Sequence, residues 1–160
     1  MSSRFAEGTE VPVVKSRAEL EALLNKHGAM HTAFFTGPRE AAIAFEIGGR
    51  RVLFRMALPE PGEKRFTHYR HNSGQLKPRS PTAAAEQFEA GCRQKWRALL
   101  LSIKAKLVSV QEGIETLEEA FMAHVVMPDG QTVAEHVKPR IAAAYDSGIM
   151  QPLLPPPRNT

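Results

Sequence analysis

One stretch, residues 80–111, restricts the fold of this chain more than any other. Its sequence, SPTAAAEQFEAGCRQKWRALLLSIKAKLVSVQ, predicts a single long helix with an apolar face and a basic face. Ser80 is a suitable N-cap, and Pro81 occupies the first helical position, where its missing amide proton costs nothing. At about 1.5 Å per residue such a helix is roughly 45 Å long. We therefore expect one end to project from the domain or to join a partner.

Apolar residues recur at steps of three and four along this helix, and they are Phe88, Cys92, Trp96 (or Leu99), Ile103, Leu107 and Val110. The run 99–101, three leucines, widens the stripe, so burial on more than one side is expected. The sheet predicted before the helix and the helices predicted after it are the expected packing partners. We interpret Cys92 and Trp96 as core residues rather than as a nucleophile and a base-stacking ring.

The 160 residues are 42% hydrophobic and 24% charged, which is typical of one globular domain with a real core. The chain has no run of about 18 apolar residues, so no transmembrane helix is predicted. Its N-terminus lacks a hydrophobic segment of secretory length. The single Cys92 cannot form an internal disulfide and fits a reducing cytosol. We expect one α+β domain over residues 1–154 and a Pro-rich tail over residues 155–160.

The first third predicts a helix followed by a small antiparallel sheet. Residues 1–10 are polar and are expected to fray. Ser16 and Glu19 match a capping box that opens a helix over 17–27, and Gly28 supplies its left-handed end. Three β-like runs follow at 30–36, 40–47 and 50–58, and Gly48-Gly49 between the last two predicts a tight hairpin. Alternation in the third run gives one apolar face and one face with Arg51 and Arg55.

Residues 60–79, EPGEKRFTHYRHNSGQLKPR, form a basic connector with interleaved aromatics. Cations for phosphates and rings for bases are what a single-stranded nucleic-acid surface requires. The connector residues that could serve in this way are Lys64, Arg65, Phe66, His68, Tyr69, Arg70, Lys77 and Arg79. The alternative is a solvated loop whose rings pack on the core. The pair His68 and His71 also suggests half of a metal site, but no further ligand lies at a useful spacing.

The long helix adds a second candidate surface. Arg93, Arg97 and Lys104 lie at steps of four and seven, which places them on one strip that could follow a phosphate backbone. The alternative is an ordinary solvated helix face.

The last third predicts two capped helices and a Pro-rich end. Capping boxes begin at Thr116 and at Thr132, and a Pro-Asp-Gly turn separates the two helices. Leu117, Phe121 and Val125 are expected to face inward. The second helix carries Val137, Ile141 and Tyr145 and contains Pro139, which is expected to kink it or shift its start. Residues 149–160 are expected to be irregular, with a polyproline conformation at 155–157.

Motifs for catalysis or for cofactors are not evident. The four glutamates Glu112, Glu115, Glu118 and Glu119 accompany His124, but glutamates at helix starts are already explained by capping and by the helix dipole. No glycine-rich phosphate loop, GxSxG elbow or HExxH sequence occurs. We predict no metal, no cofactor and no enzymatic activity.

The segments VPVVKSRAELE, CRQKWRALLLSIKAKL and TLEEAFMAHVVMPDGQTVAEHVKPRIAAAYDSGIMQPLLP resemble a family of small proteins encoded by bacteriophages and prophages. The resemblance covers most of the chain and implies a phage origin and a bacterial cytoplasm, but no activity or site residues. The predicted order of one helix, three strands and a long helix is also that of single-strand annealing proteins, an analogy of fold alone.

With a net charge of +4, these observations favour a basic accessory protein that binds nucleic acid, most plausibly single-stranded DNA, in phage replication or recombination. The alternative is a protein-interaction module that self-assembles as a homo-oligomer or inhibits a host protein, suggested by the length of the helix and the Pro-rich tail.

Overall fold

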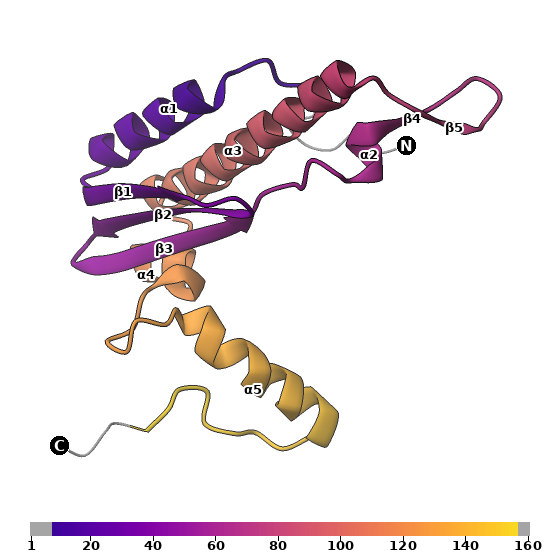
Figure 1. Ribbon diagram of the computed structural model, residues 1–160. Coiled ribbons are helices and arrows are strands. Elements are labelled where there is room, and N and C mark those ends of the chain that lie inside the picture. The colour runs from indigo at the N-terminus through magenta and orange to yellow at the C-terminus, as the bar shows by residue number, and fades with distance from the viewer. Residues whose placement is uncertain (1–7, 157–160) are drawn as a thin grey trace.

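The computed structural model of the chain describes residues 8–156. Residues 1–7 of the predicted frayed end and residues 157–160 of the predicted tail lie outside the described residues. The fold is α+β, with one helix, a three-stranded sheet, one long helix and shorter C-terminal helices, as the sequence predicts (Figure 1). The elements are α1 (Val13–Lys26), β1 (Met30–Thr36), β2 (Glu40–Ile47), β3 (Arg50–Ala57), α2 (Lys64–Thr67), β4 (His68–Arg70), β5 (Leu76–Pro78), α3 (Pro81–Gln111), α4 (Leu117–Phe121), the 3₁₀ turn η1 (Met122–His124) and α5 (Val133–Ser147).

The main sheet is an antiparallel meander in the order β1-β2-β3. The β2–β3 hairpin turns at Gly48 and Gly49, whose φ angles of 56° and 71° require glycine, and pairs Ile47 with Arg50. The strand bounds match the sequence prediction except that β3 ends at Ala57, one residue early. Strand β1 contains a bulge between Met30 and Ala33, where His31 has a φ of 54°.

One face of the sheet is buried and the other is open. Alternation along β2 buries Ala41, Ile43, Phe45 and Ile47 and leaves the residues between them partly exposed. On the buried face, Phe45 and Phe54 stack with ring centroids 6.4 Å apart. Phe121 from α4 meets both rings edge-on, at 6.0 Å and 6.2 Å. This aromatic cluster fixes the C-terminal part of the chain against the sheet.

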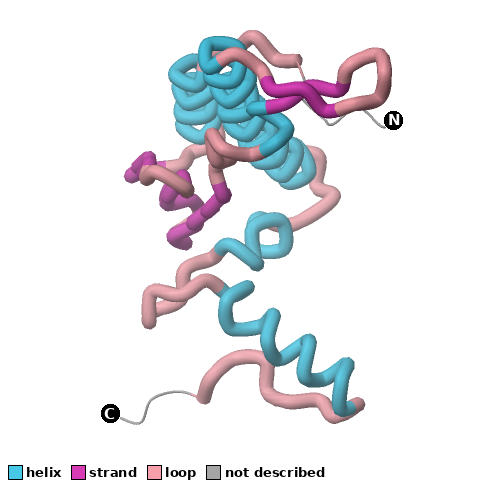
Figure 2. The backbone as a smooth tube through the Cα atoms, turned by 45° about the vertical axis from the view of Figure 1, so that its right-hand side comes forward, coloured by secondary structure: helices cyan, strands magenta, loops and turns pink. Residues whose placement is uncertain are grey.

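Helix α3 covers the buried face of the sheet, and α1 packs against α3 (Figures 1 and 2). Ser80 caps α3, since its side-chain oxygen accepts a hydrogen bond from the Ala83 amide at 3.2 Å. The buried residues of α3 are Trp96, Leu99, Leu100, Ile103 and Leu107. The first half of the helix, residues 81–95, therefore contributes no fully buried side chain. We call this segment the α3 overhang.

The start of α1 differs from the prediction. The helix begins at Val13 after Pro12, one turn before the expected start, and it has no side-chain cap. The Ser16 amide donates to the Pro12 carbonyl at 3.1 Å, and the Ser16 side chain is buried instead of capping. Val13 packs against the core, so burial of this residue extends the helix across the predicted cap. The predicted left-handed end at Gly28 is confirmed, with a φ of 82°.

Both predicted C-terminal capping boxes are confirmed. Thr116 and Glu119 bond reciprocally at the start of α4, as do Thr132 and Glu135 at the start of α5. Between the two helices, Val125 forms an isolated bridge with Val52 at the free edge of β3, and the predicted turn brings the Met127 amide to the Gln131 carbonyl at 2.7 Å.

Helix α5 does not join the core that covers the sheet. It contains no buried residue, Pro139 lies inside it, and Gly148 ends it in the left-handed conformation. Its main packing partner is η1, whereas α4 packs on α3. The expectation that α3 supports all the later helices thus holds for α4 and is wrong for α5. Among residues 8–156, no helix is long and apolar enough to cross a membrane.

Replacement of Phe121 tests the aromatic cluster. Phe121→Ala should lower the free energy of unfolding by about 3–5 kcal/mol, because it removes a ring that is 1% exposed and leaves a cavity. Phe35→Ala is the matched control, since this ring is 57% exposed on the open face, and its effect should stay within about 1 kcal/mol. Urea unfolding followed by circular dichroism measures both. Equal losses would show that Phe121 is not part of the core.

Candidate nucleic-acid interface

The basic connector is folded as a projecting hairpin. Strands β4 and β5 pair antiparallel, with Tyr69 opposite Lys77 and Arg70 opposite Leu76. The turn closes through the His71 amide, which donates to the Gln75 carbonyl at 2.8 Å, and at the base the Arg79 amide donates to the Thr67 carbonyl at 2.7 Å. We call residues 64–79, that is α2 with this hairpin, the basic arm. Figure 1 shows the hairpin extending away from the sheet and beyond the start of α3.

The root of the basic arm is fixed on the α3 overhang. Phe66 is buried and lies edge-on to Phe88, with ring centroids 5.9 Å apart. Its ring fits where α3 has Gly91, because a Cβ atom at that position would lie 2.7 Å from the ring. Phe66 is therefore an anchor, as the alternative of rings packed on the core predicted, and not an exposed stacking ring. The Arg65 guanidinium lies over the Phe66 ring at 4.5 Å and pairs with Glu63 at 2.6 Å, while its side chain stays partly exposed.

The hairpin itself gathers cations around one exposed ring. Tyr69 is 38% exposed, its cross-strand neighbour Lys77 is exposed, and the Arg79 guanidinium lies 5.6 Å from the Tyr69 ring centre. Arg70 projects on the opposite face of the hairpin, because successive residues of a strand alternate. Within residues 8–156, Lys64, Arg70, Lys77 and Arg79 form no ion pair with a carboxylate. The charges of Lys64, Arg70 and Lys77 lie on exposed side chains and remain available to a ligand, whereas Arg79 is half-buried.

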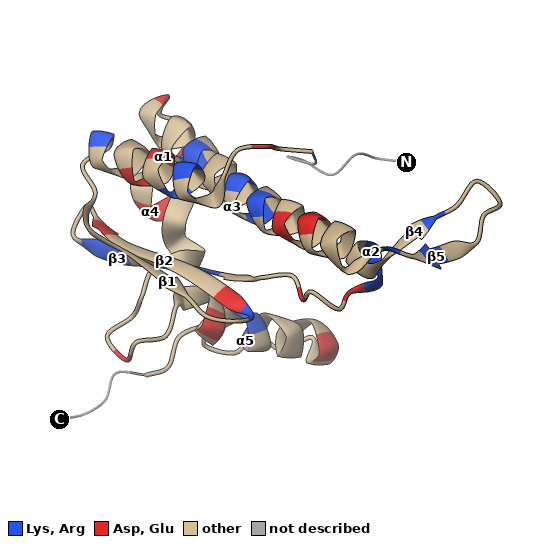
Figure 3. Cartoon of the chain, turned by 45° about the horizontal axis from the view of Figure 1, so that its top comes forward, with Lys and Arg blue, Asp and Glu red and all other residues tan. Residues whose placement is uncertain are grey.

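The arm also lies in a segment without acidic residues. From Lys64 to Ala85 the chain has five Lys or Arg and no Asp or Glu. The whole chain has 21 basic and 17 acidic residues, so the remainder holds 16 basic against 17 acidic ones. The net positive charge is thus a local property of the arm, which Figure 3 shows as a hairpin with blue but no red segments.

The predicted basic strip on α3 is not a free surface. Arg93 and Arg97 share one side of the helix, as predicted, but that side faces α1 and the segment before it. Arg97 pairs with Glu19 of α1 at 2.6 Å, and the Arg93 Nε donates to the Thr9 carbonyl at 3.4 Å. Of the three strip residues only Lys104 is exposed. The strip therefore serves mainly to join α1 to α3.

The two sheet arginines lie on a third surface. Arg51 and Arg55 are exposed on the open face of the sheet, away from α3. Arg55 pairs with Glu135 at the start of α5, with 2.6 Å between the charged atoms, and Arg51 is the cross-strand partner of Glu46. This face carries both signs of charge. The structure thus brings the hairpin cations together and separates them from the other predicted cations.

The two histidines of the arm are bound to hydroxyl groups. His68 Nδ1 lies 2.8 Å from the Thr67 hydroxyl, and His71 Nδ1 lies 3.1 Å from the Ser73 hydroxyl. In the described part of the chain, no group of three His, Cys, Asp or Glu side chains could hold a metal ion. Burial, with help from Glu89, raises the pKa of the Cys92 thiol, which keeps it protonated and unreactive at neutral pH.

His124 is half-buried against the core. Its ring stacks on Phe54 with centroids 3.8 Å apart, and burial, followed by the nearby Lys106 charge, lowers its pKa. The neighbouring glutamates have other roles: Glu119 closes the α4 cap, and Glu115 accepts a hydrogen bond from Ser109 at 2.7 Å.

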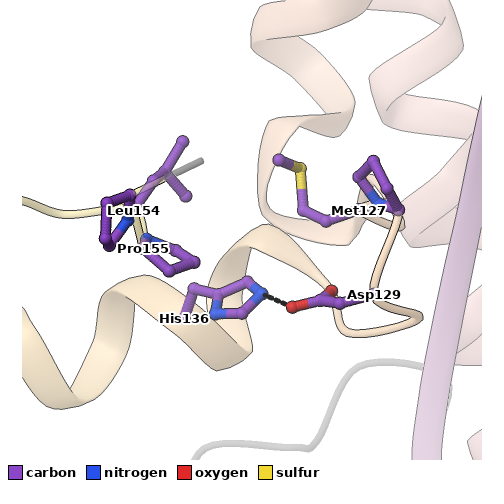
Figure 4. A pocket seen from close by; sticks show the side chains of 7 residues that line it. Met127, Asp129, His136, Leu154 and Pro155 are labelled. Carbon is purple, nitrogen blue, oxygen red and sulfur yellow. Dashed lines mark ion pairs between the residues drawn. The ribbon is translucent and has the colours of Figure 1, made fainter. Parts of the chain in front are cut away.

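A pocket near the C-terminus was not predicted from the sequence. It has a volume of about 570 Å³ and lies between the 127–130 turn, the start of α5 and the Pro-rich segment (Figure 4). Asp129 and His136 meet there at 2.8 Å. The pKa of Asp129 is lowered mainly by the hydrogen bond that its side chain accepts from the Gln131 amide. The interaction with His136 lowers this pKa further. The other residues that line the pocket are apolar, and Met127, Leu154 and Pro155 are labelled in Figure 4. The Asp129–His136 pair links the turn to α5.

No protein-family model, curated protein or solved structure matches this chain. The arrangement of its own residues must therefore support any functional proposal.

Removal of the Phe66 ring should free the basic arm without unfolding the domain. In the original chain the Arg79 amide donates a hydrogen bond to the Thr67 carbonyl. In Phe66→Ala this amide should exchange with deuterium at least about tenfold faster, because the arm loses its anchor. Amides of β2 should keep their protection. Phe88→Ala, which removes only the partner ring, should give a smaller effect in the same direction. Unchanged exchange at Arg79 in Phe66→Ala would contradict the anchor role.

The low pKa of His124 predicts a pH dependence of stability. An unfolded histidine binds a proton near pH 6.5, whereas native His124 resists protonation until a lower pH. The unfolded state therefore binds more protons between these two pKa values, and the free energy of unfolding should fall as the pH drops from about 7 to about 5.5.

Chemical denaturation across this range should show a shallower decline for His124→Phe than for the original chain. Phe35→Ala, which changes no titratable group, is the control and should keep the original slope. Carboxylates with a lowered pKa, such as Glu119 and Glu135, change the free energy of unfolding mainly below about pH 4.5. Their titration therefore does not obscure the effect of His124. An identical slope in His124→Phe would show that another group is responsible.

Proposed function

We propose that this chain is a nucleic-acid-binding accessory protein that holds single-stranded DNA on its basic arm. The proposal includes the phage origin and bacterial cytoplasm implied by the family resemblance, with a role in phage replication or recombination. The observation that carries it is the projecting hairpin, which holds Lys77 and Arg79 beside the exposed Tyr69 ring and Arg70 on its other face. Within residues 8–156 these three cations have no acidic partner.

Local charge supports a polyanion as the ligand. Affinity for nucleic acid depends on the number of cations that reach phosphates together, not on the net charge of the whole protein. The arm supplies such a set, whereas Arg97 and Arg55 are paired with Glu19 and Glu135. Arg51 lies opposite Glu46, and Arg93 is bonded to the Thr9 carbonyl. A hairpin that projects from the body also approaches a nucleic acid without steric conflict from the sheet.

The Tyr69 ring favours a single strand. Bases of a single strand can stack on an aromatic side chain, at about 1–3 kcal/mol for each base, but bases inside a duplex cannot. Arg79 beside the ring can neutralise the phosphate next to a stacked base. A two-stranded ribbon also fits the major groove of a duplex, so the choice of strand requires a direct test.

Fluorescence anisotropy with a short labelled oligonucleotide provides that test. The double variant Arg70→Ala/Lys77→Ala should bind more weakly than the original chain. It should also reduce the slope of log affinity against log salt by about 1.4, because each phosphate contact on a single strand contributes about 0.7. Lys15→Ala/Lys26→Ala removes the same charge from exposed positions on α1 and should leave affinity nearly unchanged.

Tyr69→Ala separates the two strand types. It should weaken single-strand binding about 5- to 150-fold with little change in salt slope, and it should leave duplex binding unaffected. Equal effects of the arm variant and the α1 variant would contradict the arm as the site. Absence of binding to any oligonucleotide at low salt would contradict the function itself.

A second candidate function is that of a protein-interaction module. It is favoured by a separate observation, the lack of any buried residue in α5. Because most helices in proteins are stabilised by packing of an apolar face, an unpacked one is typical of a surface that meets another chain.

A further inference from the structure

The C-terminal helix and the segment after it lie at the end of the molecule away from the basic arm (Figures 1 and 2). This part of the chain exposes a large apolar surface. The exposed side chains are Ile141 (43%), Tyr145 (88%), Ile149 (60%), Met150 (79%), Leu153 (39%) and Leu154 (42%). Five residues of the same region, Ile141, Ala144, Tyr145, Met150 and Leu153, line one groove with a volume of about 440 Å³. We call residues 141–154 the C-terminal face.

The segment after α5 forms one side of this groove instead of covering it. The Arg140 guanidinium donates hydrogen bonds to the Pro152 carbonyl and, at 3.0 Å, to the Leu154 carbonyl. These bonds hold the chain beside the helix. They place Met150 and Leu153 next to Ile141 and Tyr145 while leaving all four side chains accessible. The groove is thus ordered before any partner arrives.

The area of the C-terminal face matches one side of a standard protein interface. With about 200 Å² for each large apolar side chain, the exposed fractions of the six residues sum to roughly 700 Å². A stable interface buries about 800 Å² on each partner, and the largest apolar patch of a typical monomer is about 300–600 Å².

Charge indicates which partner fits. Asp146 is the only charged residue between positions 141 and 154, so the face has no set of charges that would select an oppositely charged protein. A surface that is apolar throughout is complementary to itself under a two-fold axis, and homodimer interfaces are the more apolar class.

We propose that the C-terminal face is a homodimer interface, in which the α5 helices of two copies pack against each other and each Tyr145 ring enters the groove of the second copy. The hairpins lie at the opposite end of each copy and remain free. A dimer would therefore present two basic arms to one strand and raise the affinity for long oligonucleotides by avidity. This last consequence rests on the proposed function, whereas the dimer itself does not.

Sedimentation velocity over about a hundredfold range of concentration tests the proposal on the full chain. The original chain should approach twice its monomer mass of 17.7 kDa. Tyr145→Glu and Met150→Glu should each raise the dimer dissociation constant at least about 30-fold, as expected for central interface residues. Ile114→Glu is the matched control, because Ile114 is 76% exposed outside the C-terminal face, and it should dimerise like the original chain.

Both face positions are exposed, and Met150 lies outside α5, so these variants should fold normally by circular dichroism. A monomer at every concentration would overturn the proposal, as would a dimer that Tyr145→Glu and Met150→Glu leave intact or that Ile114→Glu also breaks. Binding of a short oligonucleotide should be the same for Tyr145→Glu as for the original chain. Loss of the dimer and loss of DNA binding are therefore separable results.

Discussion

The fold depends on the packing of one sheet face against the second half of α3. A three-stranded sheet of this size is not stable alone, so its apolar face needs a helical cover. Trp96, Leu99, Leu100, Ile103 and Leu107 supply that cover within about three turns of helix. The first half of α3 is consequently free of the sheet, and the basic arm docks there through Phe66 and Gly91. The position of the arm thus follows from the length of α3 beyond the sheet.

Most of the scaffold could be predicted because its signals are local. Alternation along β2, the Gly48-Gly49 turn and the capping boxes at Thr116 and Thr132 each determine the backbone within a few residues. The capping motif at Ser16 failed because Val13 gains burial by extending α1 past it. The β4–β5 hairpin was not predicted, since three-residue strands show no periodicity. Gly74, with a φ of 81°, is the one signal that marked its turn.

The functional surfaces were harder to predict because they depend on which faces of the elements meet. The spacing of Arg93 and Arg97 placed them on one strip, but spacing does not reveal that α1 brings Glu19 against it. Phe66 and Tyr69 have similar sequence contexts. Phe66 is nevertheless buried against the α3 overhang, whereas Tyr69 is exposed on the hairpin. Likewise Ile141 and Tyr145 have the spacing of core residues. However, α1 and α4 pack on α3, and the apolar side chains of α5 remain exposed.

The central claim is that the basic arm is where nucleic acid binds. The most direct measurement is a two-dimensional NMR titration of the isotope-labelled chain with a short single-stranded oligonucleotide. We predict that amide shifts concentrate on residues 64–80 and the adjoining α3 overhang, with the largest changes near Tyr69 and Lys77. Shifts concentrated on the open face of the sheet, around Arg51 and Arg55, or on α1 would contradict the account.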